Sequence, residues 1–207
     1  MEAAPEGWSE ISAWRKRQRA ALMAARNALD AATHRRATRA MLDAIAQGFP
    51  DLAALLVGFY WPIRREPDPL PLVRRLVAAG GAAALPVVIG KGLPLEFRAW
   101  RPETRMATGV YDIPFPADGP AVLPQALIVP LLGFDDAGYR LGYGAGFYDR
   151  TIAGFAARPR LIGIGFALGR LPTIYPQPHD IPMDYVVTEE GLFRRVGGSL
   201  VAATAEH

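Results

Sequence analysis

The N-terminal part of the chain carries apolar residues at helical spacing. Over residues 9–29, the apolar side chains collect on one stripe of a helix that turns about 100° per residue. This predicts an amphipathic helix whose apolar face is buried, and Ser9 or Ser12 would cap its first turn. The members of the stripe are Trp14, Ala21, Leu22, Ala25 and Leu29.

Three arginines lie beside that apolar stripe. Arg15, Arg19 and Arg26 fall within about 40° of one another on the helical wheel, at the edge of the face expected to be buried. They form either a solvated basic face or a row of guanidinium groups available to an anion, and spacing alone leaves both open. A second helix is predicted over residues 33–47, with Arg35, Arg36 and Arg39 on its outer side.

Beyond residue 50 the pattern changes to short apolar runs that alternate with helical segments. Short, mostly apolar runs predict buried strands, and the alternating run at residues 95–100 predicts an edge strand. Strand, helix and strand within residues 55–88 form a β-α-β unit, so its two strands should be parallel. The predicted strands cover residues 55–60, 82–88, 95–100, 126–132, 161–167 and 185–188, with helices at 70–79 and 147–156.

This alternation predicts an α/β fold in three layers, with helices on both faces of a sheet. We find no internal repeat and no linker, so one domain is expected over residues 1–207, with an N-terminal helical segment at about 9–47. The small, polar tail after about residue 197 is expected to be frayed.

The composition narrows the possible chemistry. The chain has 207 residues, of which 51% are hydrophobic and 21% charged, as expected for a globular protein. It contains no Cys and three His, which excludes disulfides, cysteine nucleophiles and cysteine-bound zinc. The apolar runs are far shorter than the roughly 20 residues of a membrane span, and no signal peptide is visible. We therefore expect a cytoplasmic protein with no membrane partner. The net charge of +3 suits anionic small molecules and also permits nucleic-acid binding.

A glycine-rich segment gives the strongest local signal for chemistry. Residues 138–150 read GYRLGYGAGFYDR and connect a predicted strand to a predicted helix. Such a loop can cradle a phosphate, because glycines let backbone N–H groups approach the anion. The glycine spacing matches neither a Walker A loop nor a dinucleotide fingerprint. A tight turn that packs the helix onto the sheet would give the same pattern, so both interpretations stand.

Polar side chains near this loop are candidates for holding phosphate and a cation. Asp149 would hold Mg²⁺ beside a phosphate, or would be an ordinary first-turn aspartate. Arg140 would neutralise phosphate oxygens or would be a surface charge. Asp180 and Asp184 lie four residues apart in a proline-bounded loop, which would bind a cation or simply form a turn.

The segment WPIRREPD at residues 61–68 follows the first predicted strand. Loops at the carboxyl ends of strands bind ligands in α/β sheets. A flat apolar surface beside charged groups suits a heteroaromatic ligand. The alternative is a proline-stiffened loop with a partly buried Trp61.

Taken together, these segments resemble the 5-formyltetrahydrofolate cyclo-ligase family over about residues 14–189. The most specific part is RLGxGxGFYD at residues 140–149. Several supporting segments keep the family's order, which makes the set more specific than any one motif. They are the basic N-terminal helix, residues 60–68, GVYDIP at 109–114, VPL at 129–131 with Phe134-Asp135, and His179-Asp180.

The resemblance implies a fold of the NagB/RpiA/CoA-transferase type and an enzyme that uses ATP and Mg²⁺. The implied reaction converts 5-formyltetrahydrofolate to 5,10-methenyltetrahydrofolate through an N5-iminium phosphate, with release of ADP and phosphate. ATP and a reduced folate would be the partners, and we expect a monomer that binds no nucleic acid. The residues implied for ATP are Arg15, Arg19, Arg140, Leu141, Gly142, Tyr143, Gly144, Ala145, Gly146, Phe147 and Tyr148. Those implied for folate are Trp61, Ile63, Glu66, Asp68 and Tyr148, those for Mg²⁺ are Asp149 and Asp180, and those for catalysis are Arg140, Tyr148 and Asp149.

The chain also departs from the family's pattern. Arg15 stands where many members carry Lys, which keeps the charge but changes its hydrogen-bond geometry. Tyr143 and Ala145 replace basic residues that some members carry in the glycine loop, which leaves phosphate contacts there to the backbone. Two alternatives remain: a paralogous ATP-binding enzyme with another substrate and, with less support, a nucleic-acid-binding protein.

Overall fold

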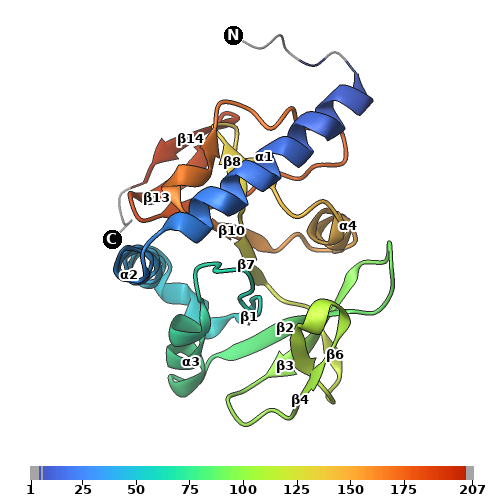
Figure 1. The fold of residues 1–207 in the computed structure, drawn as a ribbon. Helices are drawn as coiled ribbons and strands as arrows, with labels where there is room; N and C mark the ends of the chain where they lie inside the picture. Colours follow the sequence, from blue (N-terminus) through green and yellow to red (C-terminus); the bar gives the residue numbers. More distant parts are fainter. Residues whose placement is uncertain (1–4, 6, 204–207) are drawn as a thin grey trace.

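A nine-stranded sheet lies at the centre of the computed structural model, which describes residue 5 and residues 7–203 (Figure 1). In chain order its strands are β1 (Leu56–Gly58), β2 (Ala82–Val88), β3 (Leu95–Trp100), β6 (Ala121–Val122), β7 (Ala126–Pro130), β10 (Arg160–Ile164), β12 (Tyr185–Thr188), β13 (Gly191–Val196) and β14 (Ser199–Ala202). The spatial order is β14-β13-β12-β10-β7-β1-β2-β3-β6. The five middle strands, from β12 to β2, are parallel. The outer strands on both sides are antiparallel to their neighbours.

Helices cover both faces of this sheet, which confirms the predicted three-layer α/β fold. The helices α2 (Ala31–Gly48) and α3 (Leu70–Ala78) pack on one face, and α4 (Phe147–Ala153) packs on the other. Successive side chains of a strand point to opposite faces. On β7, Ile128 accordingly joins the cluster under α2 and α3, whereas Leu127 joins the cluster under α4.

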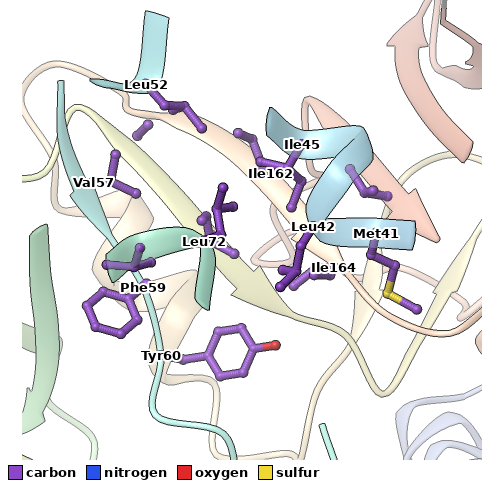
Figure 2. Close-up of a cluster of buried hydrophobic side chains, with 14 of the residues drawn as sticks. Met41, Leu42, Ile45, Leu52, Val57, Phe59, Tyr60, Leu72, Ile162 and Ile164 are labelled. Atoms are coloured by element: carbon purple, nitrogen blue, oxygen red, sulfur yellow. The ribbon is translucent and has the colours of Figure 1, made fainter. Parts of the chain in front are cut away.

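Figure 2 shows the larger of these clusters, in which side chains of α2 lie against the sheet. Leu42 and Ile45 of α2 pack with Ile162 and Ile164 of β10, and all four are almost completely buried. Burying one such side chain contributes about 1.5–3 kcal/mol relative to leaving it exposed. This apolar contact fixes α2 on the sheet and thereby the position of the helix that precedes it.

That preceding helix, α1 (Trp8–Ala28), agrees with the predicted segment except at its start. Its N-cap residue is Gly7, and no side chain caps the first turn. The predicted capping by Ser9 or Ser12 is therefore wrong, because both serines lie inside the helix.

The buried face of α1 is turned from the predicted stripe toward the arginines. Arg15 and Arg26 are buried, while Ala21 and Ala25 are exposed. The interpretation of a solvated basic face is therefore wrong for Arg15 and Arg26. Small alanines can be left in water at little cost. The guanidinium groups instead donate hydrogen bonds to residues of the loops that pack against α1, Arg15 to Asp180 and Arg26 to Tyr143. The apolar anchor of the helix is Leu22, which packs with Leu132, Leu141 and Ile174.

Two further sequence expectations need correction at the edges of the sheet. The tail after residue 197 is not frayed as far as the structure describes it, because β13 and β14 form a hairpin there. The strand β3 is not the edge strand, since the two-residue strand β6 pairs outside it. The predicted domain also includes residues 1–4, 6 and 204–207, which lie outside the described residues.

Two smaller sheets and three single turns complete the described elements. The strands β8 (Gly133–Asp135), β9 (Arg140–Leu141) and β11 (Arg170–Leu171) form one small sheet, and β4 (Met106–Thr108) pairs with β5 (Pro114–Pro116). The 3₁₀ turns are η1 (Pro50–Ala54), η2 (Val110–Asp112) and η3 (Ala167–Gly169). Among the described residues, no helix combines the length and the apolar character needed to cross a membrane.

Candidate active site

A cavity of about 860 Å³ opens beside the carboxyl ends of the parallel strands. The ends of β2 and β7 line it, as do the loop after β1, the glycine-rich loop before α4 and the N-terminal half of α1. Its volume falls within the roughly 300–1,000 Å³ typical of small-molecule sites. Its place is the one where α/β sheets generally bind ligands, because loops from several strands converge there.

Most residues that the sequence predicted for the site line this one cavity. They come from four segments and are Arg15, Arg19, Trp61, Ile63, Glu66, all of residues 140–149, and Asp180. Asp68 does not line it. Its carboxylate accepts a hydrogen bond from the Leu70 amide at 2.9 Å, where α3 begins. Asp184 also lies elsewhere, bonded to Arg158 and to the amide of Leu161.

The glycine-rich loop lines the cavity and is bonded to Arg19. Arg19 of α1 donates from Nε to the carbonyl oxygen of Gly142 at 2.7 Å. Gly144 has a φ of +98°, which favours glycine, and a Cβ there would come within 3.2 Å of the Arg19 guanidinium. The loop thus needs glycine both for its backbone conformation and for its close approach to α1.

Two arginine–aspartate pairs stand at the cavity wall. Arg15 donates to Asp180 at 2.5 Å, and Arg140 donates to Asp149 at 2.6 Å. Backbone amides complete both carboxylates: that of Gln177 donates to Asp180 at 2.7 Å, and that of Ile181 donates to Asp149 at 3.2 Å. The pairs tie the loop around residues 174–181 to α1 and α4, and they bring the two predicted Mg²⁺ ligands to the same cavity.

These two aspartates fit a cation that arrives together with phosphate. Among the described residues, no group of three or more His, Asp or Glu side chains could hold a metal ion by itself. Mg²⁺ is commonly held by one or two carboxylates plus phosphate oxygens and water. A carboxylate offers about four acceptor positions. Asp149 therefore keeps acceptor capacity beyond its bonds to Arg140 and Ile181.

Glu66 is a buried carboxylate with two partners from different loops. Its side chain lines the cavity although the residue is only 4% exposed. Oε2 accepts from the Ile63 amide at 2.9 Å, and Oε1 accepts from the Tyr143 hydroxyl at 2.7 Å. Burial raises the pKa of Glu66, while the Ile63 amide, the Tyr143 hydroxyl and the charges of Arg26 and Arg64 oppose that rise.

Two tyrosines form flat walls near Glu66. Burial, and then the charge of Glu66, raise the pKa of both Tyr60 and Tyr148, so their hydroxyls stay neutral at physiological pH. The Arg140 guanidinium carbon lies 5.2 Å from the centre of the Tyr148 ring, which is cation–π distance. The Tyr60 hydroxyl donates to the carbonyl oxygen of Pro67, which fixes the loop that carries Glu66.

The structure also adds residues that the sequence left unassigned. Arg64 and Arg150 line the cavity, and Arg150 donates to the carbonyl oxygen of Ala145 at 2.5 Å. Arg26 donates from Nη2 to the Tyr143 hydroxyl at 2.8 Å. Arg64 and Arg150 stand inside segments already predicted to bind ligands, so their positions carried a signal. Arg26 had only its place on the helical wheel.

Comparisons with known proteins show what this chain is similar to. Residues 11–189 match the model of the 5-formyltetrahydrofolate cyclo-ligase family. A protein of that name from Mycolicibacterium smegmatis is 36% identical over 137 residues, which cover 62% of this chain and 71% of that protein. One from Escherichia coli is 32% identical over 147 residues, which cover 67% and 80% of the two chains. The solved structure of Aquifex aeolicus 5,10-methenyltetrahydrofolate synthetase superposes with a TM-score of 0.76 at 25% identity, covering 93% of this chain and 96% of that one.

Proposed function

Because the chain belongs to the 5-formyltetrahydrofolate cyclo-ligase family, we propose that it converts 5-formyltetrahydrofolate and ATP to 5,10-methenyltetrahydrofolate, ADP and phosphate. The observation that carries the proposal is the composition of the large cavity. Its glycine-loop side offers arginines for an anionic nucleotide, and its Glu66 side offers a carboxylate between aromatic rings for a pterin.

The distribution of charge supports the glycine-loop side of the cavity as the site for ATP. Arg15 and Arg140 are each neutralised by an aspartate, whereas the hydrogen bonds of the Arg19 and Arg150 side chains within the described residues run to backbone carbonyls only. Arg19 and Arg150 therefore supply net positive charge for the triphosphate, and Arg15 and Arg140 shape the wall beside it. Because Arg150 lies against Ala145, it supplies a charge close to where the glycine loop has none of its own.

Folate would bind on the Glu66 side. The pterin edge carries two adjacent N–H donors, on N3 and on the 2-amino group, and a carboxylate can accept both. Trp61, Ile63 and Tyr148 offer apolar surface for the ring. Asp68 is not among the residues that line the cavity, so its sequence-based assignment as a folate contact gains no support from the geometry.

The chemistry needs positioning more than a protein nucleophile. The formyl oxygen attacks the γ-phosphorus of ATP and ADP leaves, which gives an N5-iminium phosphate. N10 then attacks the formyl carbon and loses its proton, and phosphate leaves with its electron pair. The protein aligns the formyl oxygen with the γ-phosphate and stabilises the charge that develops, which accounts for the lack of a catalytic triad among the described residues. Mg²⁺, held through Asp149 and Asp180, would neutralise phosphate charge when bound.

The nucleic-acid alternative loses its main support. It requires a continuous basic face on the N-terminal helices, but Arg15 and Arg26 are buried and Arg19 faces the glycine loop. A monomeric state and a cytoplasmic location stay predictions from the sequence.

The first experiment is an absorbance measurement. Purified protein with 5-formyltetrahydrofolate and Mg-ATP should produce the near-ultraviolet band of the methenyl bridge, because the new N5–C–N10 unit extends the conjugation. The rise should need both ATP and Mg²⁺. No rise from protein that still binds ATP would contradict the reaction and favour a paralogous enzyme with another substrate.

A further inference from the structure

Arg26 is a buried cation whose partners are incomplete. It is 2% exposed, and the one hydrogen bond of its side chain among the described residues runs from Nη2 to the Tyr143 hydroxyl. Its Nε and Nη1 are buried without a hydrogen-bond partner in the described part of the chain. A buried guanidinium is costly unless an anion lies close by. The anion joined to Arg26 is Glu66, which it reaches through the hydroxyl of Tyr143.

The direction of each hydrogen bond between Arg26, Tyr143 and Glu66 is fixed. The guanidinium of Arg26 can only donate, so the Tyr143 oxygen accepts a hydrogen bond from it. The Tyr143 hydroxyl in turn donates a hydrogen bond to Glu66 Oε1. The Ile63 amide holds the other oxygen, Oε2, at 2.9 Å. Both carboxylate oxygens of Glu66 are therefore held: Oε1 by Tyr143 of the glycine loop, and Oε2 by Ile63 of the loop that carries Glu66 itself. Each oxygen keeps acceptor capacity for a ligand in the cavity.

From this geometry we infer that Arg26 and Tyr143 are positioning residues that orient the Glu66 carboxylate toward the pterin edge of the folate. The inference rests on the proposed function, in which Glu66 accepts the two adjacent pterin donors. Two parallel hydrogen bonds require the carboxylate plane to match the plane of the ring. A carboxylate held at both oxygens before the ligand arrives loses less freedom on binding.

Arg26 and Tyr143 also act on the ionisation of Glu66. The groups that face this carboxylate are Arg26 on α1, Arg64 on the same loop, Tyr143 on the glycine loop, and Tyr60 and Tyr148 beside it. The Ile63 amide, then the hydroxyl of Tyr143 and the two arginines, favour its charged form against the effect of burial. Removing Arg26 or that hydroxyl raises the pKa of Glu66 further. Folate binding, which needs the carboxylate ionised, then weakens at a higher pH than in the unchanged protein.

The test compares Tyr143→Phe and Arg26→Met with a matched control. Tyr143→Phe keeps the ring and removes only the hydroxyl, and Arg26→Met keeps much of the side-chain length and removes the charge. Tyr139→Phe removes a hydroxyl from a tyrosine that faces Arg195, outside the cavity. We expect the KM for folate to rise by about tenfold or more in both test variants, as for loss of a hydrogen bond to a charged group. The affinity of the folate-free protein for a non-hydrolysable ATP analogue should stay within about twofold, and Tyr139→Phe should match the unchanged protein in both measurements.

The pH profile separates positioning from a merely structural role. In Tyr143→Phe and Arg26→Met, the acidic limb of kcat/KM for folate should move to higher pH. The inference would be overturned if both folded variants kept the acidic limb of the pH profile and the KM for folate unchanged. It would also be overturned if the variants lost only kcat and thermal stability. If the unchanged protein forms no methenyl-folate, the proposed function itself fails and the role of Glu66 fails with it. That outcome differs from an active enzyme whose two variants bind folate as the unchanged protein does, which would overturn only the inference.

Discussion

Asp149 has two partners in the structure, the guanidinium of Arg140 and the backbone amide of Ile181. It orients an arginine at the cavity wall, and in the proposed function it also shares a cation with bound phosphate. Asp149→Asn keeps the shape and the amide contact but removes the charge. We expect kcat to fall at least tenfold, because fixed charge near a developing phosphate charge is worth several kcal/mol. The check is steady-state kinetics of methenyl-folate formation, combined with a thermal melt.

A surface pair provides the control for that variant. Asp51 bonds Arg160 through both oxygens at 2.8 Å, but the pair lies far more open to solvent. Exposed pairs contribute little, about 0–1 kcal/mol, because solvent screens them. Asp51→Asn should therefore leave turnover and melting temperature almost unchanged. If both variants behave alike, Asp149 has no special part in the reaction.

The residues of the site were accessible to sequence reasoning to different degrees. The glycine loop and Glu66 lie in short segments whose pattern already pointed to a ligand. Arg26 is different, because its partner Tyr143 lies 117 residues away along the chain. Helical periodicity can place an arginine on a face, but it cannot say which loop will close over that face. Only the tertiary contact with the glycine loop shows that Arg26, one member of the basic stripe, is a buried hydrogen-bond donor.

At the scale of elements, Asp30 caps α2 and so fixes the junction with α1. Oδ1 accepts from the amides of Ala32 and Thr33 at 2.9 Å, and these bonds, that of Thr33 above all, lower the pKa of Asp30 to about 2. A carboxyl group whose pKa is lower in the folded state stabilises the fold above its unfolded pKa, near 3.9. That contribution is lost as the pH falls through about 2.

Asp30→Ala should therefore melt a few degrees lower than the unchanged protein at neutral pH. The difference should shrink as the pH falls through about 2, because below that pH the carboxyl group is protonated in both states. Asp30→Asn, which still accepts the two amide hydrogen bonds, should recover much of the loss. Thermal melts across pH test this, and equal melting temperatures for Asp30→Ala and the unchanged protein at neutral pH would contradict it. The junction matters for the site, since Arg65 donates there to the carbonyls of Asn27 and Leu29.

Some strands were predicted at their observed bounds. The bounds of β2 and β3 agree with the predicted residues 82–88 and 95–100. The hairpin of β13 and β14 was missed because its side chains are mostly half-buried or exposed, which hides the alternation. A signal was present, however. Gly197 and Gly198 both have positive φ, and a Gly-Gly pair between alternating residues is typical of a tight hairpin turn.

At the scale of the whole molecule, the cavity joins segments that are distant in sequence. Helix α1 holds the glycine loop through Arg19, and the glycine loop holds the loop of Glu66 through Tyr143. A nucleotide that orders the glycine loop therefore also orders the residues proposed to bind folate. The second ligand then loses less conformational freedom on binding, which makes the two binding events cooperative.

This predicts that nucleotide and folate raise each other's affinity. Coupling between two sites is reciprocal, so each ligand must strengthen the other by the same factor, and factors of about 5–150 are typical. Calorimetric titration of 5-formyltetrahydrofolate, with and without a saturating non-hydrolysable ATP analogue and Mg²⁺, measures one direction. Titration of the analogue with and without folate measures the other. Folate affinity that ignores the analogue would show that the two parts of the cavity bind independently. If the link runs through the hydroxyl of Tyr143, the same titrations on Tyr143→Phe should give a coupling factor closer to one, even where nucleotide affinity alone is unchanged.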